Sequence, residues 1–276
     1  MDIDKMDPGA MRFESREELI KQVHDLWMDS DKNFYHNVSV DIVILGYHER
    51  TLKVLLQKPG FSEDKWMLPG GYIRRTQTVE EAAVEVVRDR TRLTDLDLMQ
   101  FHVFSRPGRN RGYEDKIRTQ FEEVGIDAPK NFWIFDDFLS VGFFALTDYS
   151  KVRPSGSFYS EECRWFDIDA LPPLVYDHSE IVAAALRRLR HHIVFHPIGY
   201  SLLPDKFTLP EIHSLYETIL GRHLDERNFT KKLVGLGLIV KTRETRKIGP
   251  HRSPFLYIFD KARYDQLLRE DEAILV

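Results

Sequence analysis

The segment GGYIRRTQTVEEAAVEVVRDRTRL, residues 70–93, gives the clearest indication of the fold. A glycine pair ends a turn after LP, and a helix follows because apolar residues from Val79 to Leu93 recur at helical spacing. Strand-like alternation is found at 38–48, 51–59, 98–105, 136–149 and 163–168. A helix at 177–193 closes this part of the chain. We therefore expect an α+β fold in which helices sandwich a mixed β-sheet.

The same segment resembles the signature of the Nudix family with most of its carboxylates replaced. That signature runs glycine, five residues, Glu, seven residues, Arg-Glu, an aliphatic residue, one residue, Glu-Glu, one residue, glycine and an aliphatic residue. Its glutamates hold a divalent metal that polarises a diphosphate and activates water. Gly71 matches the first glycine, but Gln77, Val86 and Arg90 replace glutamates, and only Asp89 remains as a metal carboxylate. We expect a Nudix-type domain without hydrolase activity, catalytic residues, metal or cofactor.

Two other interpretations of this segment stay open. An unrelated amphipathic helix after a glycine turn would give a similar pattern, although LPGG, EEAA and the downstream RWFDIDALPPL keep the Nudix frame. A hydrolase that recruits Glu80, Glu81 and Glu85 is the second, although Glu80 and Glu81 fall a turn or more too early.

A different pattern begins after the proline-containing segment FHPIGYSLLPDKF, residues 195–207. A helix is expected from Thr208 as cap, with Glu211 at the capping-box position and Gly221 as its end. A second helix is expected after Asp225, and a hairpin follows in the range 238–259. Helix, turn, helix and hairpin in this order predict a winged helix-turn-helix.

The charge of the chain is unevenly distributed. Residues 222–263 carry eleven Lys or Arg against four Asp or Glu, a net +7, whereas the whole chain carries −5. A basic segment on an acidic protein indicates a polyanion-binding surface, although a solvated charged face would have the same composition. The expected DNA contacts are Arg227, Asn228, Lys231, Lys232, Lys241, Arg243, Arg246, Lys247 and Arg252. Arg227 suits guanine and Asn228 adenine, and the remaining cations suit phosphates.

The block FTLPEIHSLYETILGRHLDERNFTKKLVGLGLI, residues 207–239, is similar to the linker-and-helix block of the NrtR-like, Nudix-related transcriptional regulators. SREELIKQVHDLWM, with Ser15 as cap, predicts a helix within an N-terminal segment, 1–34. The resemblance covers about residues 35–260 and implies a Nudix-like effector-binding domain (35–195) and a winged helix-turn-helix DNA-binding domain (196–276). It implies an effector-responsive regulator, expected to be a repressor of NAD or sugar metabolism genes, that binds operator DNA as a homodimer. The effector would be ADP-ribose, a sugar phosphate or a sugar.

Six residues are the candidates for effector contact: Tyr72, Arg74, Arg75, Phe104, Arg106 and Arg109. The arginines follow a glycine turn or a strand end and can bind phosphate or carboxylate. The aromatic rings can stack on a base or a sugar. Each of these side chains also fits a purely structural role, as a solvated arginine or as an aromatic ring of the core.

Two other functions stay open: a Nudix hydrolase of ADP-ribose-like nucleoside diphosphates with an accessory winged helix, and a protein-interaction module. Val86 and Arg90 disfavour the first, and the basic hairpin beside Arg227 disfavours the second. A single cysteine, Cys163, and the lack of a signal-like N-terminus or a long apolar run indicate a cytoplasmic protein.

Overall fold

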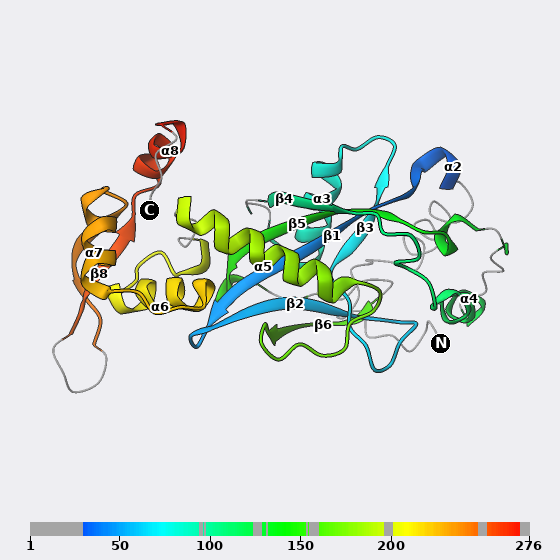
Figure 1. Ribbon diagram of the computed structural model, residues 1–276, viewed down its shortest axis with the longest axis horizontal. Coiled ribbons are helices and arrows are strands. Elements are labelled where there is room, and N and C mark those ends of the chain that lie inside the picture. Colours follow the sequence, from blue (N-terminus) through cyan, green and yellow to red (C-terminus); the bar gives the residue numbers. More distant parts are fainter. Residues whose placement is uncertain are drawn as a thin grey trace. The chain divides into compact units, whose positions relative to one another are not determined.

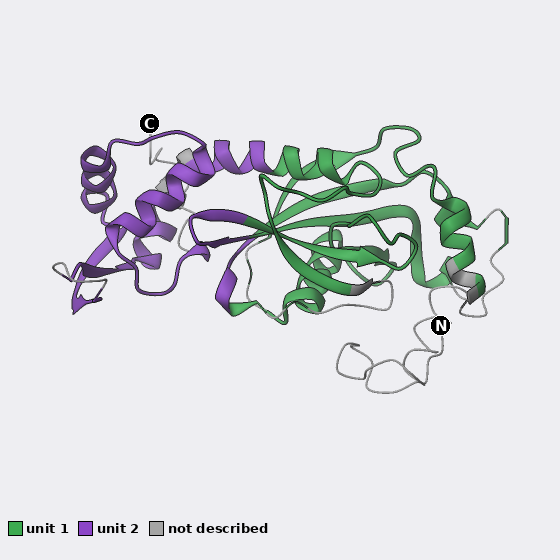
Figure 2. Cartoon of the chain, turned by 90° about the horizontal axis from the view of Figure 1, so that it is seen from below, with its two compact units in different colours: residues 1–45, 53–145, 151–185 green, residues 46–52, 146–150, 186–276 purple. Residues whose placement is uncertain are grey.

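The computed structural model describes residues 30–93, 96, 98–123, 129–130, 132–152, 154, 160–195, 201–247 and 253–270. The helix expected near the N-terminus, after Ser15, lies outside these residues. The chain forms two compact units, shown in Figure 2: unit 1 comprises 1–45, 53–145 and 151–185, and unit 2 comprises 46–52, 146–150 and 186–276. The expected boundary near 195 does not coincide with this division, which falls within the last long helix before it.

Six strands make one sheet, labelled in Figure 1: β1 (Phe34–His48), β2 (Thr51–Pro59), β3 (Gly70–Arg74), β4 (Leu98–Phe104), β5 (Leu139–Asp148) and β6 (Ser160–Asp167). Their order is β4-β5-β1-β2-β6, and β3 pairs with β1. The pairs β1–β3, β2–β6 and β4–β5 are antiparallel. β1 is buried without interruption from Val40 to Gly46, which is typical of a strand covered on both faces.

Local sequence explains two connections in this sheet. β1 and β2 are joined at Glu49 and Arg50, both with positive φ, as in the mirror-image turns that match the twist of a hairpin. β3 was not expected from the sequence because it begins with the glycine pair. A Cβ at Gly70 would lie 2.8 Å from the Val40 carbonyl oxygen, so β3 can approach β1 this closely only with glycine there.

The helix of the opening segment is α3 (Val79–Thr91). Thr78 and Glu81 form a capping box, and Arg92 ends the helix in the left-handed region at φ 63°. Ala82, Ala83 and Val86 pack into a core with strand residues. Among the described residues before 200, the other helical elements are α2 (Ser30–Asn33), α4 (Glu114–Glu123), the 3₁₀ turns η2 (Trp133–Phe135) and η3 (Tyr149–Lys151), and α5 (His178–Phe195). In the part of the chain that is described, no helix is long and apolar enough to cross a bilayer.

Unit 2 contains the expected winged helix. Its elements are α6 (Leu209–Leu220), α7 (Glu226–Gly235), β7 (Ile239–Thr245), β8 (Phe255–Phe259) and α8 (Lys261–Glu270). α6 ends at Gly221 with φ 63°, and Asp225 caps α7 by accepting a 2.7 Å hydrogen bond from the Asn228 amide. β7 and β8 pair antiparallel. The α+β class and the winged helix are therefore confirmed, whereas α8 was not expected.

Candidate functional site

Three positions at which the Nudix signature has glutamates carry other side chains in this chain. Gln77 Oε1 accepts a 3.2 Å hydrogen bond from the Arg74 amide, and its Nε2 donates to Glu85 at 2.5 Å. Val86 lies close to the turn, since a Cβ at Gly71 would come within 2.9 Å of its Cγ2. The Arg90 residue is 6% exposed, and its Nε donates to Gln57 Oε1 at 2.7 Å. These positions supply an amide, an alkyl group and a cation, which do not fit a Mg²⁺ ion.

Among the residues that the structure describes, no group of three or more His, Cys, Asp or Glu side chains is arranged to hold a metal ion.

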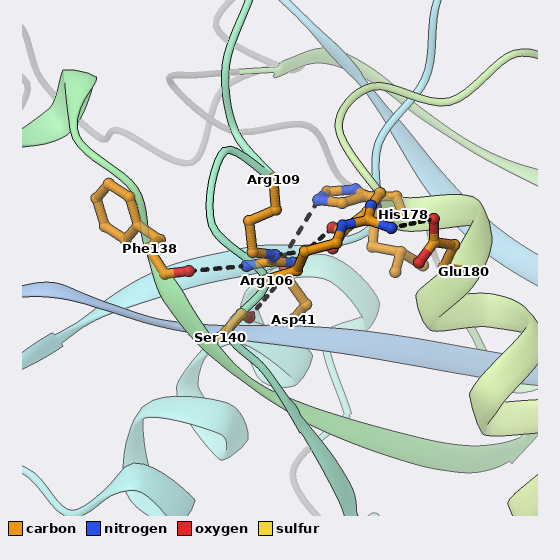
Figure 3. Close-up of polar contacts among 9 residues, drawn as sticks. Asp41, Arg106, Arg109, Phe138, Ser140, His178 and Glu180 are labelled. Carbon is orange, nitrogen blue, oxygen red and sulfur yellow. Dashed lines mark hydrogen bonds and ion pairs between the residues drawn. The ribbon is translucent and has the colours of Figure 1, made fainter.

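A buried polar cluster lies at the start of α5 and is drawn in Figure 3. The Arg109 side chain is 2% exposed and binds the Asp177 carboxylate with two hydrogen bonds, of 2.8 Å from Nε and 2.6 Å from Nη2. Its Nη2 also lies 3.7 Å from Asp41 Oδ2. Ser140 donates a 2.5 Å hydrogen bond to that same Asp41 oxygen. The cluster therefore joins β1, β5, the loop after β4 and the start of α5.

Charge in this cluster favours the ionised guanidinium. Burial alone would lower the pKa of Arg109, but its hydrogen bonds to Asp177 and the charge of Asp41 outweigh burial and raise it. His178 is the neutral member: burial lowers its pKa, and its Nδ1 accepts a 2.9 Å hydrogen bond from the Leu68 amide. That bond requires an unprotonated Nδ1, so His178 ties the segment before the Nudix-type turn to α5 in a structural role.

Three of the six expected effector residues are linked by contacts. Tyr72 packs against Phe138, with 5.7 Å between ring centroids, and burial raises its pKa. The Phe138 carbonyl accepts a 3.4 Å hydrogen bond from Arg109 Nη1. The Arg109 guanidinium in turn lies 5.9 Å from the Phe104 ring centroid. Tyr72, Phe104 and Arg109 thus border one region, although Arg109 is buried and already bound to carboxylates.

The other three expected residues have separate partners. Arg74 lies over the Phe34 ring at 4.8 Å. Arg75 donates from Nε to the Asp31 carbonyl at 3.0 Å and lies over the Tyr35 ring. Arg106 is an exposed residue that pairs with Glu180 at 3.0 Å. No contact that involves Arg74 or Arg75 joins them to Arg106 or Arg109 in the described structure.

Residues that the sequence did not single out complete this region. Asp41 is a charged residue within the apolar run VSVDIVILG, which is a signal that could have identified it, because a charge is rarely buried unless it is paired. Tyr113 and Tyr176 pack together with ring centroids 4.8 Å apart, and Lys65 donates to the Tyr113 hydroxyl at 2.9 Å. Tyr176 has φ 51°, an uncommon conformation for a non-glycine residue.

The second candidate region is the outer face of α7. Arg227 and Asn228, in its first turn, and Lys231, in the next, are exposed, whereas Phe229 and Leu233 are buried. The helix therefore presents cationic and amide side chains and buries Phe229 and Leu233, while Val234, near its C-terminal end, is exposed. This arrangement is the one by which a recognition helix reads base edges in the major groove.

The other expected DNA-contacting residues differ in their exposure and in the contacts that their charged groups already make. Arg243 and Lys247 are exposed and Lys232 is half-buried. The ammonium group of Lys241 lies 3.4 Å from the Phe255 ring centroid. Arg246 is half-buried and bound to Glu211 and to the Lys206 carbonyl. Arg252 lies outside the described residues.

The two ion pairs of unit 1 should differ strongly in their contribution to stability. Arg109→Ala leaves Asp177 and Asp41 buried without their cation, so the free energy of unfolding should fall by about 3–5 kcal/mol. Arg106→Ala removes only an exposed pair and should cost about 0–1 kcal/mol. Denaturant unfolding of the full chain measures both. Equal losses for the two variants would contradict the structural role given to Arg109.

Comparison with known proteins agrees with this architecture. Residues 199–259 match the family described as the NrtR DNA-binding winged helix domain. The ADPR responsive transcriptional repressor NtrR of Acinetobacter baylyi is 26% identical over 246 residues, which cover 83% of this chain and 84% of that protein. The ADP-ribose pyrophosphatase of Methanocaldococcus jannaschii is 26% identical over 149 residues, covering 53% of this chain and 73% of that enzyme.

A solved structure shows the same fold. Shewanella oneidensis NrtR, crystallised with a 27mer DNA, superimposes with a TM-score of 0.64 at 21% identity, covering 83% of this chain and 95% of that chain. The expected combination of a Nudix-type fold and a winged helix is confirmed by this match. The chain is thus similar to NrtR-type proteins: residues 199–259 match the NrtR DNA-binding winged helix domain, and they follow a unit with the Nudix-type fold.

Proposed function

We propose that this chain is an ADP-ribose-responsive repressor whose winged helix binds operator DNA and whose Nudix-type unit senses the effector without hydrolysing it. The observation that carries the proposal is the first turn of α7, where Arg227 and Asn228 are exposed beside a capping Asp225. The repressor relative from Acinetobacter baylyi and the DNA-bound Shewanella oneidensis NrtR support it.

A single α7 would contact too few base pairs to select one site in a genome. A homodimer doubles the contact, and its two-fold symmetry requires an inverted repeat with half-sites about one or two helical turns apart. The net +7 of residues 222–263 supplies the general attraction to phosphates, and Arg227 and Asn228 supply the base preference.

ADP-ribose sensing is proposed for the region that Tyr72, Phe104 and Arg109 border, together with the exposed Arg106, whose carbonyl accepts a 3.2 Å hydrogen bond from the Arg109 amide. A diphosphate needs cations and a nucleoside needs aromatic surface, and exposed Arg106 and half-buried Tyr72 are side chains of these two kinds. Arg109 is proposed to shape this region through Asp177 and Asp41. Arg74 and Arg75, at the end of β3, remain candidates, and a sugar phosphate or a sugar remains an alternative effector to be tested in parallel.

The proposal that the chain does not hydrolyse ADP-ribose rests on the side chains that α3 would offer to a metal ion. The pyrophosphatase relative shows that a similar domain can serve an enzyme. In this chain, however, the Arg90 cation occupies a position where the Nudix signature has a glutamate, and like charges repel a metal ion. The scaffold is then left with binding as its function, which is what a sensor requires.

The first prediction for this function concerns DNA. Arg227→Ala should cost roughly 1–3 kcal/mol at the operator and relax the preference at one base position. Lys231→Ala should weaken binding to all DNA sequences similarly and should reduce the slope of log K against log salt by about 0.9. Footprinting upstream of the chain's own operon, followed by salt-titrated binding, measures both effects. Wild-type binding without operator preference would exclude the repressor.

The second prediction concerns the effector. ADP-ribose should bind with EDTA present and should release the operator, because the proposed contacts need no metal. Arg106→Ala should weaken ADP-ribose binding about tenfold or more, the loss of a charge-assisted hydrogen bond. Calorimetry with ADP-ribose, ribose 5-phosphate and ribose in separate titrations identifies the effector class. Arg75→Ala is the matched control, and a larger loss for it than for Arg106→Ala would move the site to the end of β3.

The third prediction concerns chemistry. When the protein is incubated with ADP-ribose and Mg²⁺ or Mn²⁺, neither AMP nor ribose 5-phosphate should form faster than in the uncatalysed background. Chromatography of the products, with an active pyrophosphatase as positive control, measures this. Turnover near the typical enzyme value of about ten per second would show that the chain is a hydrolase.

A further inference from the structure

The base of the wing is held to the first helix of the winged helix by side chains. Arg246 directly follows β7. It donates from Nη1 to Glu211 Oε1 at 2.7 Å and from Nη2 to the Lys206 carbonyl at 2.6 Å. Lys206 in turn binds both oxygens of Glu244, at 2.6 and 2.8 Å. One arginine therefore bridges the segment before α6, the first turn of α6 and the end of β7.

These contacts lie where the strand ladder is interrupted. Lys241 pairs with Tyr257, but the next pair is Thr245 with Phe255, so β7 has two more residues than β8 over this stretch. Within it, Thr242 Oγ1 donates to the Leu256 carbonyl at 2.9 Å and accepts from the Glu244 amide. A bulge of this kind bends a strand and re-aims its side chains. The direction of the chain as it enters the wing is thus set by side-chain contacts as well as by the ladder.

Glu211 makes the attachment specific. Its Oε2 accepts the Thr208 amide at 2.7 Å and so caps α6, while its Oε1 is bound by Arg246. The planar guanidinium suits this site, because it donates to a carboxylate and a carbonyl in two fixed directions, which an ammonium group cannot do. The wing is therefore coupled to the N-terminus of α6 through one carboxylate.

We infer that Arg246 is a positioning residue, which fixes the direction of the wing by its bonds to Glu211 and Lys206, and is not a phosphate-binding residue. The phosphate contacts of the wing are then made by side chains that the structure leaves exposed, Arg243 and Lys247. This inference rests on the proposed function, since the wing must bind DNA for its direction to matter.

A substitution at Glu211 tests the inference through the direction of the change in operator affinity. Removing a carboxylate from a DNA-binding surface normally strengthens binding or leaves it unchanged, because the repulsion of phosphates is reduced. Glu211→Gln should instead weaken operator binding, roughly tenfold, because the bond that positions the wing is lost. Glu226→Gln, which removes an exposed acid from α7, is the matched control and should not weaken binding.

Salt dependence tests the same inference at Arg246. Arg246→Ala should weaken operator binding while the slope of log K against log salt stays as in the wild type, because no phosphate contact is lost. Arg243→Ala should reduce that slope by about 0.9. Arg246→Lys keeps the charge but not the fork and should behave like Arg246→Ala. The double variant Arg246→Ala with Glu211→Gln should be no weaker than Arg246→Ala alone.

All variants are measured in the full chain, at a temperature well below the unfolding midpoint of each. A flattened salt slope for Arg246→Ala, full rescue by Arg246→Lys, or tighter binding by Glu211→Gln overturns the inference and leaves the repressor proposal intact. A wild-type chain that binds no operator overturns the proposed function and the inference with it.

Discussion

The polar end of the Nudix-type unit depends on one guanidinium buried between two carboxylates. Arg109 comes from the loop after β4, Asp41 from β1 and Asp177 from the residue before α5, so three distant segments meet at a single charge. Neither carboxylate could be buried there without that cation, since an unpaired charge in the interior is strongly unfavourable. The loop that carries Arg109 and Arg106 is fixed to the sheet for this reason. The proposed effector region takes its shape from that fixed loop.

In this chain the Nudix-type frame is present, whereas Gln77, Val86 and Arg90 stand at positions where the Nudix signature has glutamates. The frame depends on backbone geometry: the Gly70 turn that lets β3 meet β1, and the apolar face of α3 that packs on the sheet. The chemistry depends on carboxylates, and side chains at those positions can change while the helix stays in place. Gln77 binds the Arg74 amide and Glu85, so the residue at a signature glutamate position contributes to the turn itself.

Periodicity and caps predicted most of the fold because these signals are local. The apolar face of α3, the capping residues Thr208 and Asp225, and the alternation of β1 and β2 each act within a few residues. β3 was missed since its glycines carry no strand preference, although the close approach to Val40 requires them. Side-chain partners could not be predicted, because Arg109 and Asp177 are 68 residues apart in the chain. Only the folded sheet brings them within hydrogen-bonding distance.

The winged helix shows the same limit in its charges. Composition counts Arg243 and Arg246 as equal cations, and both were expected to contact DNA. In the folded unit Arg243 is exposed, whereas Arg246 already donates to a carboxylate and a carbonyl. A cation engaged in this way must break those bonds before it can bind a phosphate, so part of the new interaction is offset. The charge available to DNA is therefore smaller than the net charge of the segment, and the spatial arrangement of acids such as Glu211 decides which cations remain free.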